Sequence, residues 1–206
     1  MKKSDHPLPQ RLFHWVNLVS VGMLLITGFM LYRPVNGYRL DTVLYIHLTF
    51  AYLFLANGFG RVYYSFFGKY RDFPEFALGP KDWKPFWETV RYYLFLGPLI
   101  HRNKYNPMQK TAYLFLILLG LIQAATGLAM LWPKSGWAFV NAVTGGLAGS
   151  WFTHYLVAWI FIFIIIIHLY LVFTEPTSSV RLMLFGIAPE DKGAPAGPPQ
   201  GDVQRG

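Results

Sequence analysis

Four histidines stand inside long apolar stretches of this sequence, where an ionisable side chain is costly and usually serves a function. They are His14, His47, His154 and His168, whereas His6 and His101 lie in polar segments. One histidine in such a stretch could simply hydrogen-bond a neighbouring helix. Four together favour a site that uses the imidazole nitrogens, either as metal ligands or as carriers of protons.

The spacing of His154 and His168 places two candidate ligands at two depths on one helix. They are 14 residues apart, so at ~100° and ~1.5 Å per residue they share a face and lie ~21 Å apart along the axis. His14 and His47 each lie near the start of an earlier apolar stretch. Because consecutive spans run in opposite directions, we expect His14 to face His168 and His47 to face His154.

Two imidazoles from facing helices can bind a haem iron from opposite sides, which completes its octahedron and leaves no open position. Such a site transfers electrons and does not bind oxygen. A zinc ion would need four ligands in one tetrahedron, and the two pairs are too far apart to share one. The chain has no cysteine, which excludes covalent haem attachment and iron–sulfur ligation. We therefore predict two non-covalently held haems b, one for each pair.

The elements that position these histidines are predicted to be membrane helices. The chain is 54% hydrophobic, 18% aromatic and only 14% charged. A helix needs ~20 mostly apolar residues to cross the ~30 Å core of a bilayer, and four segments meet this need: residues 12–33, 42–66, 109–132 and 151–173. We predict an all-α integral membrane four-helix bundle over residues 1–188, and a disordered tail over residues 189–206.

The distribution of basic residues predicts the orientation of the bundle. Eight Lys and Arg residues lie between positions 62 and 110, against Arg33 and Arg39 in the first loop and Lys134 in the third. The positive-inside rule then places both termini and the middle loop in the cytoplasm. The net charge of +8 is scattered between apolar runs, so nucleic acid is not an expected partner. Arg11, Arg33 and Arg39 are candidate donors to haem propionates, or serve only this charge bias.

The middle loop carries aromatic and aliphatic residues at helical spacing. Lys84, Glu88 and Arg91 alternate with Trp83, Phe86, Trp87, Val90, Tyr93 and Leu94. This pattern predicts an amphipathic helix at the membrane interface, which would serve either as an aromatic membrane anchor or as a docking surface for a partner.

The first and third spans share a short pattern. Thr27-Gly28 is followed by Pro34, six residues past the glycine, and Thr126-Gly127 is followed by Pro133 in the same way. The match indicates either a faint internal repeat or two unrelated sites where a glycine allows close helix packing and a proline ends a span.

Several strings resemble one known family over residues 11–187. They are Arg11 to Trp15 (RLFHW), Arg61 to Tyr64 (RVYY) with Phe67-Gly68, residues 87–96 (WETVRYYLFL), residues 104–110 (KYNPMQK), Thr126-Gly127, and His168 to Tyr170 (HLY). Together with the four histidines they resemble the cytochrome b561-like, di-haem cytochrome b subunits of respiratory nickel–iron hydrogenases, formate dehydrogenases and thiosulfate-type molybdopterin reductases.

The resemblance implies a cytoplasm-proximal haem on His14 and His168, an outer haem on His47 and His154, and a quinone pocket near the inner haem. Asn106 is carried over as a residue of that pocket, although Pro107-Met108 departs from the small pair of some relatives. Asn106-Pro107 could equally be the cap and first turn of the third span.

The function implied is that of a multi-pass subunit in a bacterial or archaeal cytoplasmic membrane. It would anchor an iron–sulfur subunit and a catalytic hydrogenase or molybdopterin subunit, and would exchange electrons with menaquinone or ubiquinone as the quinone-reactive part of the enzyme. One alternative is a stand-alone cytochrome b561 that oxidises superoxide. Another is a haem-free transporter with a histidine-lined proton path, which would show no Soret absorbance.

Overall fold

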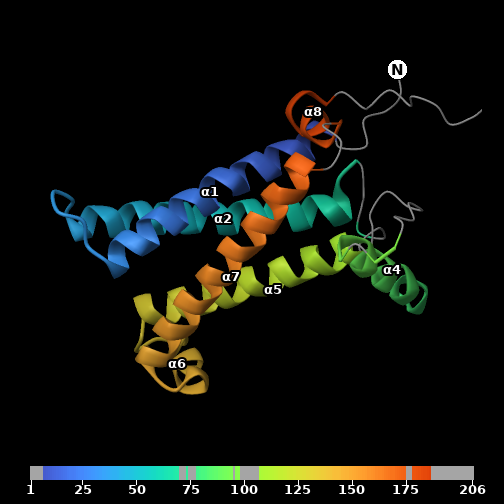
Figure 1. Ribbon diagram of the computed structural model, residues 1–206. Helices are drawn as coiled ribbons and strands as arrows, with labels where there is room; N and C mark the ends of the chain where they lie inside the picture. The colour runs from blue at the N-terminus through green and yellow to red at the C-terminus, as the bar shows by residue number, and fades with distance from the viewer. Residues whose placement is uncertain are drawn as a thin grey trace, which may run out of the picture.

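The computed structural model describes residues 7–69, 73, 78–94, 96–97, 107–174 and 178–186, and all regular structure in these ranges is helical. The long helices are α1 (Leu8–Tyr32), α2 (Leu40–Phe67), α5 (Pro107–Leu131) and α7 (Leu147–Thr174). The short ones are η1 (Pro80–Asp82), α4 (Trp83–Tyr93), α6 (Ala138–Thr144) and α8 (Ser178–Phe185). Figure 1 shows their arrangement. The predicted all-α bundle is confirmed.

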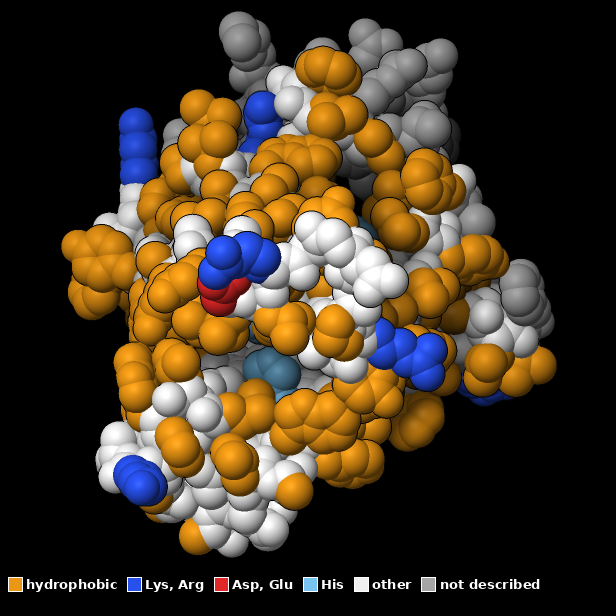
Figure 2. Space-filling model, turned by 90° about the vertical axis from the view of Figure 1, so that its left-hand side faces the viewer, with side chains coloured by type: hydrophobic (Ala, Val, Ile, Leu, Met, Phe, Trp, Pro, Cys, Tyr) orange, Lys and Arg blue, Asp and Glu red, His pale blue; other side chains and the backbone are white. Residues whose placement is uncertain are grey.

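Four helices are long and apolar enough to cross a membrane: Leu8–Tyr32, Leu40–Phe67, Lys110–Leu131 and Leu147–Phe173. They match the four predicted spans, with the first, second and fourth starting a few residues earlier than expected. Large apolar side chains such as Phe59 and Phe173 lie on the outside of the bundle, and the face drawn in Figure 2 is mostly apolar. Such a surface is stable in lipid, so the chain is a multi-pass membrane protein.

The four spans pack as two helix hairpins. α1 packs along α2, and α5 packs along α7, whereas contacts between the two hairpins are few. In Figure 1, α7 crosses the view diagonally, from α6 at its start to α8 and the beginning of α1 at its end. This path brings the two ends of α7 close to different helices. The two histidines of α7, His154 near its start and His168 near its end, can therefore have partners on different helices.

A buried polar cluster fixes α6 between the ends of α5 and α7. The Asn141 amide donates to the carbonyl oxygen of Ala129 over 3.0 Å, and the Ser150 hydroxyl donates to the Asn141 side-chain oxygen over 2.6 Å. Thr144 and Ser150 share a further hydrogen bond of 2.7 Å. Gly145 follows α6 with φ 89°, a left-handed conformation that favours glycine. This short helix was not predicted from the sequence.

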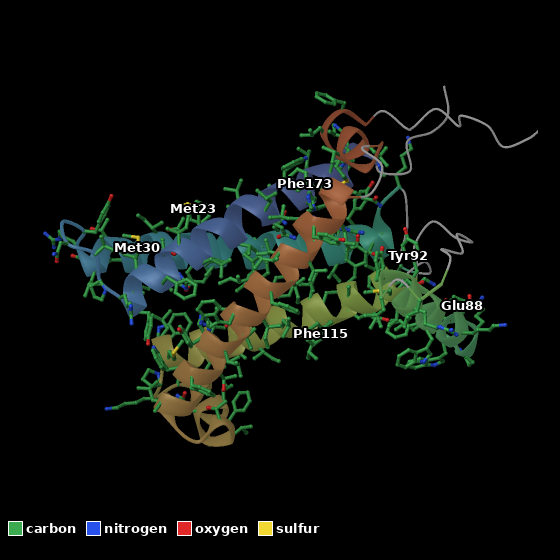
Figure 3. All side chains as sticks on the ribbon, in the orientation of Figure 1. Met23, Met30, Glu88, Tyr92, Phe115 and Phe173 are labelled. Atoms are coloured by element: carbon green, nitrogen blue, oxygen red, sulfur yellow. The ribbon has the colours of Figure 1, made fainter. Side chains whose placement is uncertain are left out.

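The predicted helix in the middle loop is α4, and it packs on the start of α5. Its Trp83 and Trp87 are 65% and 60% exposed, and Figure 3 shows Glu88 and Tyr92 at the end of the bundle away from α6. Asp82, just before α4, is buried and accepts hydrogen bonds from the Gly79 N–H over 2.8 Å and from Lys110 over 3.4 Å. These bonds, the one from Gly79 above all, lower the pKa of the Asp82 carboxyl.

The last helix, α8, folds back onto the beginning of α1. The Arg11 guanidinium donates to the Leu184 carbonyl, and the Trp15 indole N–H donates to the Met183 carbonyl, both over 3.2 Å. Gly186 follows with φ 71° and lies so close to Arg11 that a Cβ atom there would clash with the guanidinium. α1 and α8 therefore form one unit at the end of the bundle that carries His14.

Candidate functional site

The four membrane histidines lie as two pairs. In the first, the His14 pair, His14 comes from the second turn of α1 and His168 from near the end of α7. The ring centroids are 6.2 Å apart and the ring planes meet at 57°. Trp15 touches the His14 ring edge-on, with centroids 5.5 Å apart, and the same indole bonds to α8.

The second pair, called here the His47 pair, joins His47 near the start of α2 to His154 near the start of α7. Its ring centroids are 6.4 Å apart and the planes meet at 59°. The two pairs have nearly the same geometry although they lie at opposite ends of α7. Within the described ranges, no group of three or more His, Cys, Asp or Glu side chains gathers as a candidate metal cluster.

The separation within each pair matches two imidazoles that share one metal ion. An imidazole nitrogen binds a metal at ~2 Å and lies ~1.1 Å from the centre of its ring, so two trans ligands have their centroids ~6.3 Å apart. The observed separations are 6.2 and 6.4 Å. At this distance the rings are neither stacked nor joined by a direct hydrogen bond. A pair of neutral imidazoles at membrane depth gains little from such a position on its own.

Each histidine of the His47 pair is held by a threonine on a neighbouring helix. The Thr27 hydroxyl on α1 lies 2.9 Å from Nδ1 of His47, and the Thr126 hydroxyl on α5 lies 3.0 Å from Nδ1 of His154. Both threonines are buried. The sequence had shown the shared Thr-Gly pattern, but not that each copy bonds a histidine.

The glycine of each Thr-Gly pattern lies beside the same imidazole. A Cβ atom built on Gly28 would meet only the His47 ring, at 3.4 Å, and one on Gly127 only the His154 ring, also at 3.4 Å. Apart from the glycine's chain neighbours and its own helix backbone, no other atom of the described residues lies within 4 Å of either position. A side chain at either position would therefore pack against the imidazole, and the glycines keep this side of each ring free of one. Figure 2 shows a histidine at the bottom of a hollow on the face that carries the α1–α2 connection and α6.

Comparison with known proteins agrees with this geometry. Residues 5–186 match the prokaryotic cytochrome b561 family. This chain belongs to that family. It is therefore a membrane cytochrome b, an electron-transfer protein whose cofactor is haem b, and the resemblance found in the sequence is confirmed.

Several curated relatives of this cytochrome b share about a quarter of its sequence. It is 26% identical over 198 residues to a probable Ni/Fe-hydrogenase B-type cytochrome subunit of Azotobacter chroococcum, covering 85% of this chain and 82% of the relative. It is 25% identical to the corresponding protein of Cupriavidus necator, over 81% of this chain and 77% of the relative. It is also 25% identical to a probable Ni/Fe-hydrogenase 1 B-type cytochrome subunit of Escherichia coli, over 83% and 82%.

The residues of this cytochrome b fit a haem in one further respect. At the His14 end, Nε of Arg11 is buried without a hydrogen-bond partner among the described residues. A buried guanidinium donor suits an anionic group such as a propionate. Arg39, by contrast, is paired with Asp41 over 2.6 Å, which raises the pKa of Arg39.

Asn57 is a residue whose role the sequence did not reveal. In the sequence it is simply a polar residue near the end of the second predicted span. In the structure its amide donates to the Phe13 carbonyl oxygen over 2.9 Å and to the Asn17 side-chain oxygen over 2.7 Å. It therefore ties α2 to α1 directly beside His14.

An aromatic cluster joins α1 to α7 beside the His47 pair. Its closest contacts are between Tyr32 and Tyr155, with centroids 4.8 Å apart, and between Phe29 and Trp159, at 5.3 Å. Trp151 packs on both tyrosines. Tyr155 follows His154 in the chain, so the cluster restrains the segment of α7 that presents this ring.

Asn106, the predicted quinone-pocket residue, lies outside the described residues, as do His6, His101 and the predicted tail from residue 189 onward. The assignment of these positions stays a prediction from the sequence and the family resemblance.

Proposed function

We propose that this chain is the membrane subunit of a respiratory complex of the nickel–iron hydrogenase type. In this proposal it binds two haems b and carries electrons between an iron–sulfur partner subunit and the quinone pool. It would act as the quinone-reactive part of the enzyme, and menaquinone and ubiquinone are both possible substrates.

The observation that carries the proposal is the paired geometry at the two ends of α7. This helix contributes His168 to one pair and His154 to the other, with ring separations of 6.2 and 6.4 Å. A single rigid helix that supplies one ligand to each of two sites keeps the sites at a fixed separation, ~21 Å along its axis. Two sites at two depths suit transfer across the bilayer better than one.

The roles of the residues follow from their positions. His14 and His168 would hold one iron, and His47 and His154 the other, each through one ring nitrogen. A haem held in this way would supply one-electron chemistry. The chain's task is to keep both imidazoles of each pair fixed and to exclude water, and the packing of α8, Trp15 and the aromatic cluster serves that task.

The partner is proposed from the relatives, and the orientation in the membrane is proposed from the distribution of charge. The curated relatives are named as subunits of Ni/Fe hydrogenases, so the proposed partner is a hydrogenase with an iron–sulfur subunit. The basic middle loop assigns the His14 pair to the cytoplasmic side. The partner would then meet the His47 side, and quinone would react near the His14 pair and Asn106.

Haem content tests the ligand assignment. A pyridine haemochrome assay on the purified chain should give about two haems b per chain, and His14→Ala and His47→Ala should each remove one. His101→Ala serves as the matched control and should keep both, because it lies outside the spans. One haem or none in the unaltered protein contradicts the proposal, and the absence of a Soret band would favour the histidine-lined transporter.

Purification from native membranes tests the partner. A tagged chain should carry a hydrogenase with it, measured as nickel and as iron in excess of the haem iron, with hydrogen-dependent reduction of the haems. A chain that purifies alone with both haems and reduces quinone by itself would favour the stand-alone alternative.

A further inference from the structure

Thr27 and Thr126 have closely matching hydrogen-bond surroundings, and these bear on which atom carries each proton. The Thr27 hydroxyl oxygen lies 2.6 Å from the Met23 carbonyl oxygen, and that of Thr126 lies 2.7 Å from the Ile122 carbonyl oxygen. In both cases this carbonyl is four residues back on the same helix. A hydroxyl has one proton to donate, and at these short distances the proton is committed to the helix carbonyl.

The histidine must therefore be the donor in each Thr–His hydrogen bond. Nδ1 of His47 lies 2.9 Å from the Thr27 oxygen, and Nδ1 of His154 lies 3.0 Å from the Thr126 oxygen. With the hydroxyl proton used elsewhere, the threonine oxygen can only accept. Each neutral imidazole then carries its proton on Nδ1, and Nε2 keeps its lone pair.

We infer that Thr27 and Thr126 are positioning residues of the His47 pair. Each threonine oxygen accepts a hydrogen bond from the Nδ1–H group of one imidazole. This bond selects the tautomer in which Nε2 carries no proton, and it fixes the orientation of the ring. This inference rests on the proposed function, since it takes the His47 pair as the two ligands of one haem. Each copy of the Thr-Gly repeat therefore belongs to one half-site, meaning one imidazole of the His47 pair together with the threonine that orients it.

The equivalence extends beyond the threonines. A Cβ atom built on Gly28 or on Gly127 would lie at the same distances from the neighbouring imidazole, 3.4 Å from Cε1 and 3.9 Å from Nδ1. One half-site is built from α1 and α2, the other from α5 and α7, so each hairpin supplies a ligand together with the residue that orients it. Two unrelated uses of Thr-Gly would not reproduce four distances so closely.

The hydrogen bond also affects the iron. An imidazole that donates from Nδ1 gains negative charge on Nε2 and becomes a stronger ligand. A stronger ligand stabilises the ferric state more than the ferrous state. Loss of either threonine hydroxyl should therefore raise the midpoint potential of one haem, and both losses should act on the same haem although the threonines lie in different hairpins.

The test is a redox titration of Thr27→Val and Thr126→Val, in which valine keeps the shape and removes the acceptor. The same one of the two haem components should move to higher potential in each variant, further in the double variant, with a changed low-spin EPR signal. Thr27→Ser and Thr126→Ser should keep the unaltered values. The component is assigned as the one missing from His47→Ala.

Two matched controls share the hydroxyl-to-helix bond, but neither bonds a histidine of the described residues. The Thr49 hydroxyl donates to the carbonyl oxygen of Tyr45 over 2.8 Å, and the Thr153 hydroxyl donates to the carbonyl oxygen of Gly149 over 2.8 Å. Thr49→Val and Thr153→Val should leave both potentials unchanged. A general effect of removing a threonine hydroxyl would move these values too, and would overturn the inference.

The outcomes separate the inference from the proposed function. If His47→Ala removes one haem but both valine variants keep the unaltered potentials and EPR signals, the threonines do not position the ligands. If His47→Ala removes none, the ligand assignment itself fails. Should the valine variants lose haem altogether, redox-induced infrared spectra of the unaltered protein with ¹⁵N-histidine decide. The ring modes should show a strongly hydrogen-bonded Nδ1–H, and a free Nδ1–H would contradict the inference.

Discussion

The side-chain amide of Asn57 on α2 donates a 2.9 Å hydrogen bond to the carbonyl oxygen of Phe13 on α1, the residue that precedes His14. The same amide also donates to the Asn17 side chain over 2.7 Å. Both bonds lie between two membrane helices, where water is not available to replace them. They hold α1 and α2 in register at the point where α1 presents His14, a proposed ligand.

Asn57→Leu should therefore destabilise the α1–α2 hairpin and disturb the His14 pair. Removing the amide leaves the Phe13 carbonyl and Asn17 without this donor, which costs ~1–3 kcal/mol in proteins and averages less in membrane helices. The apparent melting temperature should fall, and the haem component assigned to the His14 pair should change in the optical and EPR spectra. Asn36→Leu, in the exposed α1–α2 loop, is the control. An unchanged melting temperature would show that the bond does not hold the hairpin.

Substitution of Asn106 should separate quinone chemistry from haem binding. Asn106→Ala should keep both haems, because Asn106 is not a proposed ligand, but lower quinone turnover or inhibitor affinity by ~1–3 kcal/mol if one buried hydrogen bond is lost. His47→Ala should do the opposite: it should cut electron transfer with the partner, yet leave the His14 pair able to react with an added quinol analogue. Unaltered quinone kinetics in Asn106→Ala would place the pocket elsewhere and leave Asn106 as a helix cap.

The proposed orientation in the membrane can be tested by labelling single-cysteine variants, because the sequence contains no cysteine. Ser135→Cys lies in the exposed α5–α6 connection, and Glu88→Cys lies on α4. A membrane-impermeant maleimide applied to intact spheroplasts should label Ser135→Cys at once, and Glu88→Cys only after the membrane is opened. The reverse pattern would exchange the inner and outer assignments of the two histidine pairs.

The attachment of α4 should depend on pH through Asp82. The Gly79 N–H, followed by Lys110, lowers the pKa of this carboxyl in the folded chain. A carboxyl with a depressed folded pKa contributes stability that is present above its unfolded pKa, ~3.9, and is lost as the pH falls through the folded value. Protease sensitivity of the η1–α4 segment should rise over that acidic range. In the Asp82→Asn variant, protease sensitivity at neutral pH should be higher than in the unaltered chain and should change little as the pH falls. If the variant keeps the pH dependence of the unaltered chain, Asp82 is not the group responsible.

The spans and their order were predictable because hydropathy and length decide them in a bilayer. The pairing of the histidines followed from chain direction. α1 and α7 run in opposite directions, so the start of α1 lies beside the end of α7, whereas α2 and α7 run in the same direction, so their starts lie side by side. α6 and α8 were missed because neither has a strong pattern of its own. Their helices are held by tertiary bonds, from Asn141 to Ala129 in one case and from Arg11 and Trp15 in the other.

The roles of Asn57 and of the two threonines could not be predicted for a similar reason. A polar residue in an apolar run shows that it needs a partner, but not which helix supplies it. That depends on the rotation of each helix about its axis, which packing sets and composition does not. The Thr-Gly repeat was visible in the sequence, and only the positions of His47 and His154 show what it does.

The position of α7 as the fourth of the described spans has a consequence for biosynthesis. His14 and His47 are synthesised early, yet the second member of each pair lies on α7, which begins at Leu147. A nascent or truncated chain that stops before this helix contains half of both sites and can complete neither. Of the four described spans α7 is synthesised last, so it completes both pairs together, and a chain that stops before it cannot hold haem through either proposed pair of imidazoles.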